Sequence, residues 1–166
     1  MPDHLVLAGP MGSGKTTVGE ELARRLRRPF FDSDRQIQAI HGVTARELAS
    51  LHGVERLHQE EVEALRGALS SPRPAVVAAA ASVADRPDLG EILAGARVVL
   101  LTGDPLTLAQ RARHGGHRRP IPLDEFAGLC ARRAERLGAL ADFVVDVTRQ
   151  GADRVVEEIL SRLRSP

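Results

Sequence analysis

Short apolar runs alternate with longer amphipathic stretches along this chain. Five runs have the length and composition of buried strands, at residues 5–8, 29–32, 75–78, 97–101 and 143–146. The stretches between them repeat apolar side chains at helical spacing, at residues 15–26, 54–69 and 152–163, and further helices are expected to start near residues 44 and 105. Strands that alternate with helices favour a parallel sheet covered on both faces. The pattern therefore predicts an α/β fold, a three-layer α/β/α sandwich with a five-stranded parallel sheet.

Two stretches do not fit this alternation. Residues 114–122 are polar, rich in glycine and bounded by proline, which is typical of a lid over a site. We expect this lid at about residues 112–123 of one domain that spans residues 1–166. The four alanines at 78–81 have high helix propensity, but they follow an apolar run. Their position favours the end of a strand followed by a loop.

The segment after the first apolar run is rich in glycine. Residues 9–16 match the complete G-x-x-x-x-G-K-[S/T] pattern of a phosphate-binding loop, or P-loop. Its glycines let backbone N–H groups approach phosphate oxygens, and the helix N-terminus adds positive potential. Lys15 is the only lysine among 23 basic residues and supplies a compact charge, while the Thr16 hydroxyl is placed to bind Mg²⁺. The expected nucleotide site comprises Gly12, Ser13, Gly14, Lys15, Thr16 and Thr17.

Two acidic residues, Asp32 and Asp34, follow the second apolar run. The ends of parallel strands face the ligand crevice of an open sheet. One carboxylate can hold Mg²⁺ through water, and the other can accept or orient the proton of an acceptor hydroxyl. The alternative is a helix N-cap and a surface acid. We favour the functional interpretation because the expected strand order places the pair beside the P-loop.

Arginines in and before the expected lid suit phosphoryl transfer. Negative charge spreads over the moving phosphoryl group, and a closing lid can bring an arginine onto it. Arg119, just before Pro120, is the first candidate for this catalytic role. Arg111 and Arg113 precede the polar stretch at residues 114–122 and are placed to contact the nucleotide.

Composition and charge exclude several classes of function. The 166 residues carry a net charge of only +1 and contain no Trp or Tyr, so a nucleic-acid partner is not expected. No apolar run approaches the ~20 residues that span a bilayer, and no signal-peptide pattern opens the chain. Cys130 is the only cysteine, which favours a reduced, cytoplasmic setting. We also expect a monomer with no membrane partner.

Taken together, these motifs resemble the shikimate kinase family over nearly the whole chain. The matching pieces are the P-loop, Phe-Asp-x-Asp at 31–34, Gly53-Val54-Glu55, Arg119-Pro120, and Glu135-Arg136 before Ala141-Asp142. Their order and spacing agree with the family. The resemblance implies a nucleoside-monophosphate-kinase-like P-loop fold, with a substrate-binding helical segment at about residues 33–70. It also implies ATP and Mg²⁺ as cofactors and a small-molecule hydroxyl as the acceptor.

The resemblance also implies roles for single residues. Lys15 and Thr16 would contact phosphate and Mg²⁺, and Asp32 would be the acid on the Mg²⁺ side. Lys15, Asp34 and Arg119 would form the catalytic set, with Asp34 holding the substrate hydroxyls. Arg136 would bind substrate, and Glu61 matches an acidic position that orients the family's other substrate arginine.

Two departures affect the part of the site that binds the substrate carboxylate in this family. His58 stands where the family has an arginine, and Ala79, Ala80 and Ala81 stand where it has glycines. A charged hydrogen bond contributes ~1.5–3 kcal/mol, so loss of a guanidinium weakens carboxylate binding. The added methyl groups would also crowd a close backbone approach. We therefore expect His58, Ala80 and Ala81 to contact a different acceptor: a cyclitol, a sugar-like polyol or another hydroxy acid.

Two other functions remain open at this stage. A true shikimate kinase would need Arg136 alone, or an arginine from elsewhere, to hold the carboxylate. A non-catalytic regulator would bind nucleotide without acceptor-dependent turnover. The presence of the P-loop, both aspartates and Arg119 favours an enzyme, so the sequence predicts an ATP-dependent small-molecule kinase with an altered acceptor.

Overall fold

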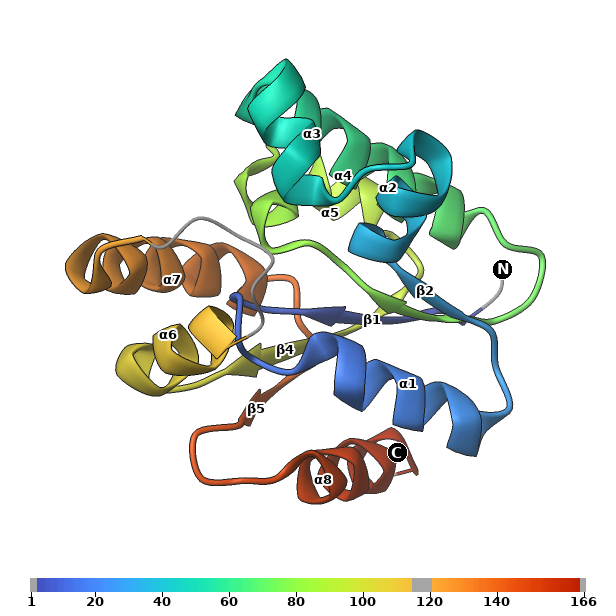
Figure 1. Cartoon of the computed structure of the whole chain (residues 1–166). Helices are drawn as coiled ribbons and strands as arrows, with labels where there is room; N and C mark the ends of the chain where they lie inside the picture. Colours follow the sequence, from blue (N-terminus) through green and yellow to red (C-terminus); the bar gives the residue numbers. More distant parts are fainter. Residues whose placement is uncertain (1–2, 115–120, 165–166) are drawn as a thin grey trace.

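A parallel sheet forms the centre of the molecule (Figure 1). The computed structural model describes residues 3–114 and 121–164. Within them the strands are β1 (Leu5–Ala8), β2 (Phe30–Asp32), β3 (Val76–Ala78), β4 (Arg97–Thr102) and β5 (Phe143–Asp146). They lie in the order β2-β3-β1-β4-β5, and each neighbouring pair is parallel. The chain moves from β1 to one side of the sheet and later to the other, so the carboxyl end of β1 lies at the crevice where open α/β sheets bind ligands.

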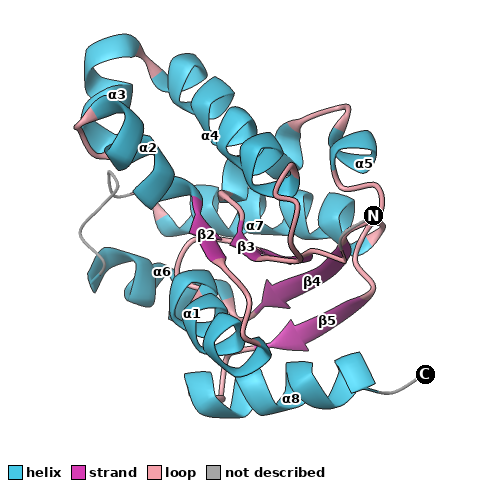
Figure 2. Cartoon of the chain, turned by 90° about the vertical axis from the view of Figure 1, so that its right-hand side faces the viewer, coloured by secondary structure: helices cyan, strands magenta, loops and turns pink. Residues whose placement is uncertain are grey.

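Helices cover both faces of the sheet (Figures 1 and 2). The face below the strands in Figure 1 carries α1 (Lys15–Leu26) and α8 (Ala152–Arg164). The other face carries α2 (Ser33–His41), α3 (Ala45–His52), α4 (Val54–Leu69), the 3-10 helix η1 (Ala81–Asp85) and α5 (Leu89–Ile92). Near the carboxyl ends of the strands, α6 (Pro105–His114) packs against α7 (Leu123–Gly138). The predicted α/β/α architecture is confirmed.

The strands are buried on both faces. In β1, Leu5 and Leu7 join the cluster under α1 and α8, whereas Val6 and Ala8 join the cluster on the α4 side. Successive side chains of a strand point to opposite faces, so a strand covered on both sides is apolar throughout. This is why continuous apolar runs in the sequence located the strands.

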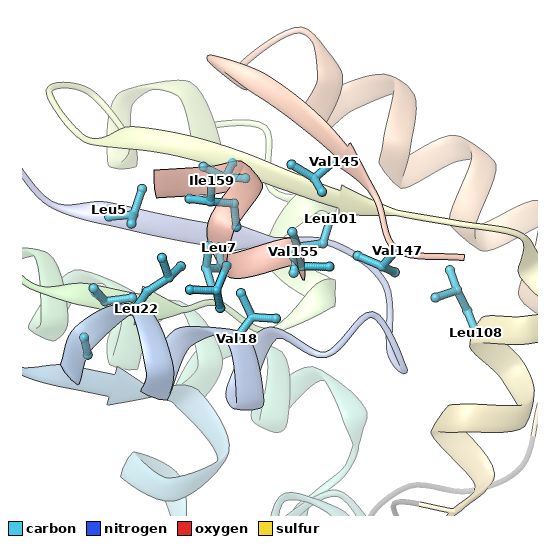
Figure 3. Packing of buried hydrophobic residues seen from close by; sticks show 14 of the residues in the cluster. Leu5, Leu7, Val18, Leu22, Leu101, Leu108, Val145, Val147, Val155 and Ile159 are labelled. Atoms are coloured by element: carbon cyan, nitrogen blue, oxygen red, sulfur yellow. The ribbon is translucent and has the colours of Figure 1, made fainter. Parts of the chain in front are cut away.

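The cluster beneath the sheet fixes the P-loop in place. Figure 3 shows side chains from the sheet meeting those of two helices, among them Leu5, Leu7, Val18, Leu22, Val155 and Ile159. Full burial of one such side chain contributes ~1.5–3 kcal/mol. Because α1 is anchored to β1 in this way, the loop that connects them has both of its ends held.

A third, separate cluster joins α2, α3 and α4. Ile37, Leu48 and Leu57 are buried there, with Val43 and Ala49 packed against them. Thr44 caps α3 in a complete capping box with Glu47, and the helix begins where the sequence predicts one. This helical segment therefore has its own small core above the sheet.

Several elements differ from the sequence pattern. The four alanines end β3 and enter η1 rather than forming an α-helix, as their position predicts. The pattern did not place α7, because Arg133 interrupts the apolar face formed by Phe126, Cys130 and Leu137. It also missed the short η1 and α5. Within residues 3–114 and 121–164, no helix is both long and apolar enough to cross a membrane.

Candidate active site

The P-loop runs so close to its neighbours that glycine is required at two positions. A Cβ atom at Gly12 would lie 2.1 Å from the backbone oxygen of Leu108 in α6, and Gly12 has φ +80°. A Cβ atom at Gly9 would lie 2.3 Å from the backbone oxygen of Leu101. Residues that carry a side chain rarely adopt a positive φ, and a Cβ atom does not fit this close to a backbone oxygen. The loop is therefore a bare backbone cradle between β1 and α1, which suits phosphate binding.

Side chains of the loop hold its shape from within. The Ser13 hydroxyl is buried and donates to the carbonyl oxygen of Pro10 at 2.8 Å. The Lys15 Nζ donates to the carbonyl oxygens of Gly9 at 2.8 Å and Pro10 at 2.9 Å. Lys15 thus lies folded over the loop, with its charge at the N-terminus of α1.

Asp32 serves two neighbours with its two carboxylate oxygens. Its Oδ1 accepts a hydrogen bond from the backbone N–H of Arg35 at 3.1 Å and so caps α2. Its Oδ2 accepts from the Thr16 hydroxyl at 2.6 Å. The carboxylate is therefore both a helix cap and the partner of the P-loop hydroxyl, so the two alternatives weighed from the sequence are not exclusive.

The pair formed by Thr16 and Asp32 fits a magnesium ion. Mg²⁺ prefers oxygen ligands, and proteins commonly supply only one or two of them, leaving the others to phosphate and water. A hydroxyl and a carboxylate 2.6 Å apart beside a phosphate cradle meet that description. In the part of the chain that the structure describes, no group of three or more His, Cys, Asp or Glu side chains could hold a metal ion by itself.

A cavity of about 540 Å³ opens at the carboxyl ends of β1, β2 and β3. Its walls come from the P-loop, the start of α2, the alanine run, the end of α6, Ile121 just before α7, and Phe126 of α7. The residues predicted from the sequence that line it are Gly12, Gly14, Lys15, Thr16, Thr17, Asp32, Asp34, Ala80, Ala81 and Arg113. The structure thus brings the predicted nucleotide and hydroxyl-binding residues together in one pocket.

Other predicted residues lie elsewhere. Ser13 is buried inside the loop, and His58, Glu61 and Arg136 do not line the cavity. Arg119 lies outside the described residues, as do residues 115–120, which are half of the expected lid. Arg111 does line the cavity, and its guanidinium donates to the carbonyl oxygens of Val147 at 3.0 Å and Thr148 at 3.3 Å.

The alanine run forms part of the cavity wall without backbone strain. Ala79, Ala80 and Ala81 are at most 7% exposed, and their methyl groups belong to the apolar floor. Ala80 has φ −62°, and in the described chain Arg27 is the only residue besides glycine with a positive φ. Alanine at these positions therefore does not require a positive φ.

Beyond the alanines, η1 packs between α4 and α7. Glu61 of α4 is fully buried and accepts a hydrogen bond from the Ser82 hydroxyl. At the other end of η1, Asp85 accepts from the guanidinium of Arg133 in α7. Arg136, one turn further along α7, is exposed and donates to the carbonyl oxygen of Ala84 at 3.2 Å. The segment from Ala81 to Asp85 thus connects the cavity wall to a group of basic side chains.

Arg133 is a candidate substrate-binding residue that the sequence analysis did not identify. Its side chain is only 12% exposed, and it shares one face of α7 with Phe126, which lines the cavity, and with buried Leu137. The spacing 126, 130, 133 and 137 is that of one helix face, so the helical period could have identified it. Hydrogen bonds from Arg133 hold the pKa of Asp85 below its ordinary value against the opposing effect of partial burial, and the charges of His58 and Arg136 add to this.

Comparisons with known proteins are consistent with this geometry. The model of the family described as Shikimate kinase matches residues 11–164. A shikimate kinase from Symbiobacterium thermophilum is 33% identical over 97% of this chain and 96% of its own length. The solved structure of a shikimate kinase from Acinetobacter baumannii in complex with shikimate has a TM-score of 0.85 at 27% identity, covering 99% of this chain and 97% of the other. A gluconokinase from Sinorhizobium meliloti has a TM-score of 0.62 at 27% identity, covering 98% and 93%.

Proposed function

The chain belongs to the shikimate kinase family and is an ATP-dependent small-molecule kinase, and we propose that it transfers the γ-phosphate of ATP to a hydroxyl of shikimate. The sequence alone favours a different acceptor. The similarity to shikimate kinases over nearly the full length of both chains supports shikimate instead. The observation that carries the proposal is one shared cavity that brings together the P-loop, the Thr16–Asp32 pair and Asp34.

The nucleotide end of the cavity has the groups that phosphate requires. Backbone N–H groups of the P-loop and the N-terminus of α1 would bind phosphate oxygens, and the Lys15 ammonium would add a positive charge. Thr16 and Asp32 would hold Mg²⁺, which supplies charge neutralisation to the phosphates when bound. Arg113 lines the same cavity and would contact the nucleotide, and Arg119 would approach from the lid.

Asp34 is the residue proposed to orient the acceptor hydroxyl. It lies in the first turn of α2 and lines the cavity directly after Asp32 and Ser33. Phosphoryl transfer through a loose transition state demands positioning and charge more than strong base catalysis. Asp34 would therefore hold the hydroxyl in line and accept its proton as the bond to phosphorus forms.

The acceptor carboxylate would be bound at the η1 end. Arg136 is the arginine proposed from the sequence, but neither it nor Arg133 lines the cavity. Arg133 is the more buried of the two guanidinium groups and lies on the α7 face that bears Phe126, a lining residue. A planar guanidinium binds a carboxylate through two parallel hydrogen bonds. We therefore assign the main carboxylate contact to Arg133, with Arg136 contributing positive charge nearby.

A second candidate function is transfer to an uncharged polyol. Two observations favour it: Arg133 is already paired with Asp85, and methyl groups line the wall formed by Ala80 and Ala81. The solved structures similar to this chain include one named a gluconokinase, so this fold also occurs in a kinase that is not named for shikimate. The non-catalytic regulator is not supported by any specific contact.

The test is acceptor-dependent ADP release with Mg-ATP. Shikimate would be compared with neutral cyclitols, sugars and other hydroxy acids, and Lys15→Ala would serve as the inactive control. Turnover of shikimate that disappears in the Lys15 variant is the expected result. Turnover of neutral polyols alone would replace shikimate by the second candidate, and nucleotide binding without any turnover would overturn both.

A further inference from the structure

Arg133, to which we assign the acceptor carboxylate, does not itself line the cavity and already holds a carboxylate of the protein. The Arg133 Nη2 donates to Asp85 Oδ2 at 2.6 Å, and its Nε lies 3.2 Å from both oxygens of that carboxylate. This is a two-nitrogen contact of the kind by which guanidinium groups recognise free carboxylic acids. We infer that Asp85 determines acceptor specificity, because it occupies Arg133 and lowers the affinity of the enzyme for acceptors that carry a carboxylate. The inference deepens the proposed function and rests on it.

The location of the pair connects it to the acceptor side of the cavity. Asp85 is the last residue of η1, whose first residue, Ala81, lines the cavity. Arg133 reaches η1 from α7, and Phe126, two turns earlier on that face, lines the same cavity. Asp85 and Arg133 thus belong to two elements, η1 and α7, that form part of the cavity wall. A change in their pairing would therefore alter the side of the cavity where we propose that the acceptor binds.

The exposure of the two side chains is unequal. Arg133 is 12% exposed, whereas Asp85 is 47% exposed. An ion pair between two exposed side chains contributes little, but a buried guanidinium requires a partner. Asp85 is that partner. Because Asp85 is the more exposed of the two, its side chain can rotate into solvent when an acceptor carboxylate binds to Arg133.

Basic side chains near Asp85 would attract an acceptor carboxylate as well, so the two carboxylates would compete. Besides Arg133, the charges of His58 and Arg136 act on Asp85 and lower its pKa. The Asp85 carboxylate therefore lies close to the basic side chains that an acceptor carboxylate bound by Arg133 would also meet. A second carboxylate must either displace Asp85 or lie beside it, and two like charges at one guanidinium repel each other. An uncharged acceptor meets neither obstacle.

The experiment uses two acceptors that differ only in this charge, shikimate and its methyl ester. Asp85→Asn keeps the shape of the side chain but removes the competing charge, with Asp85→Ser as a second variant. Asp88→Asn is the matched control, since Asp88 pairs with Arg86 and Arg66 at a separate surface hollow. Turnover and calorimetric binding are both measured, so that acceptor affinity is obtained even if an acceptor is not phosphorylated.

We expect Asp85→Asn to strengthen shikimate binding and lower its KM about tenfold, the effect of removing roughly one charged interaction. Its kcat and the constants for the methyl ester should change less than about twofold, as should all constants of Asp88→Asn. In an Arg133→Ala background the Asp85 substitution should have no further effect. Equal changes for both acceptors, or weaker shikimate binding in both Asp85 variants, would overturn the inference. Absence of turnover in every variant, with the binding difference intact, would count against the proposed reaction alone.

Discussion

Asp32 contributes to structure and chemistry through different atoms. Oδ1 caps α2, and Oδ2 faces the Thr16 hydroxyl where we propose Mg²⁺ binds. Asparagine caps helices as well as aspartate does but carries no charge. We therefore expect Asp32→Asn to lower kcat with shikimate at least ~100-fold. The free energy of unfolding should fall by less than ~1 kcal/mol.

Steady-state ADP release and urea unfolding measure the two effects separately. Asp104→Asn is a suitable control, because Asp104 also caps a helix, accepting from the Thr107 N–H at 2.9 Å, but does not line the cavity. A variant of Asp32 that lost stability without losing activity would show that the residue acts only as a cap.

At the scale of elements, the packing of the P-loop against α6 is the tightest constraint. Gly12→Ala would bring a methyl group onto the Leu108 backbone oxygen at a positive φ. We expect this variant to lose nucleotide affinity by more than about tenfold and to unfold at lower temperature, since either the loop or α6 must shift. Gly67→Ala is the control, because nothing lies within 4 Å of its added Cβ and Gly67 lies inside α4.

Alanine at position 67 should leave nucleotide binding unchanged and raise the free energy of unfolding by up to ~1 kcal/mol, since helices favour alanine over glycine. Calorimetric titration with ATP and thermal unfolding provide both readouts. Normal ATP binding by Gly12→Ala would mean that the loop adapts and that the close approach has no functional role.

The contact between η1 and α7 should depend on pH. The Asp85 carboxyl, with an ordinary pKa of 3.8, has a lower pKa in the folded protein because Arg133 donates hydrogen bonds to it. Such a group stabilises the fold at pH values above its unfolded pKa, and the contribution is lost as the pH falls through the folded pKa. We expect the difference in unfolding free energy between wild type and Asp85→Asn to be constant from pH 7 to about pH 5 and to shrink below that. A difference that is the same at every pH would show that the pKa of Asp85 does not change on folding.

At the scale of the whole molecule, local signals predicted most of the fold. Residues 54–69 and 143–146 coincide with α4 and β5, because a long amphipathic period and a compact apolar run are each distinctive. The P-loop residues were located because their motif is contiguous in sequence. Asp32 and Asp34 joined them because the carboxyl ends of β1 and β2 open into the same cavity.

The acceptor side of the cavity could not be predicted from local sequence signals. Asp85 and Arg133 are 48 residues apart, and nothing in either segment indicates that η1 and α7 bring them together. Positions 126, 130, 133 and 137 have the spacing of one helix face, but the charge of Arg133 interrupts the apolar pattern from which a buried helix is predicted. The family resemblance at Glu135-Arg136 pointed to Arg136 instead, whose side chain is exposed. Long-range ion pairs depend on tertiary packing, which a local pattern does not encode.

The most direct test of this account is ³¹P NMR of the product formed from Mg-ATP and shikimate, with Lys15→Ala as the control. The account predicts a new phosphate monoester signal that grows with ADP in the wild type and is absent in the variant. ADP formed without a shikimate ester, or an ester formed only with an uncharged polyol, would contradict shikimate as the acceptor.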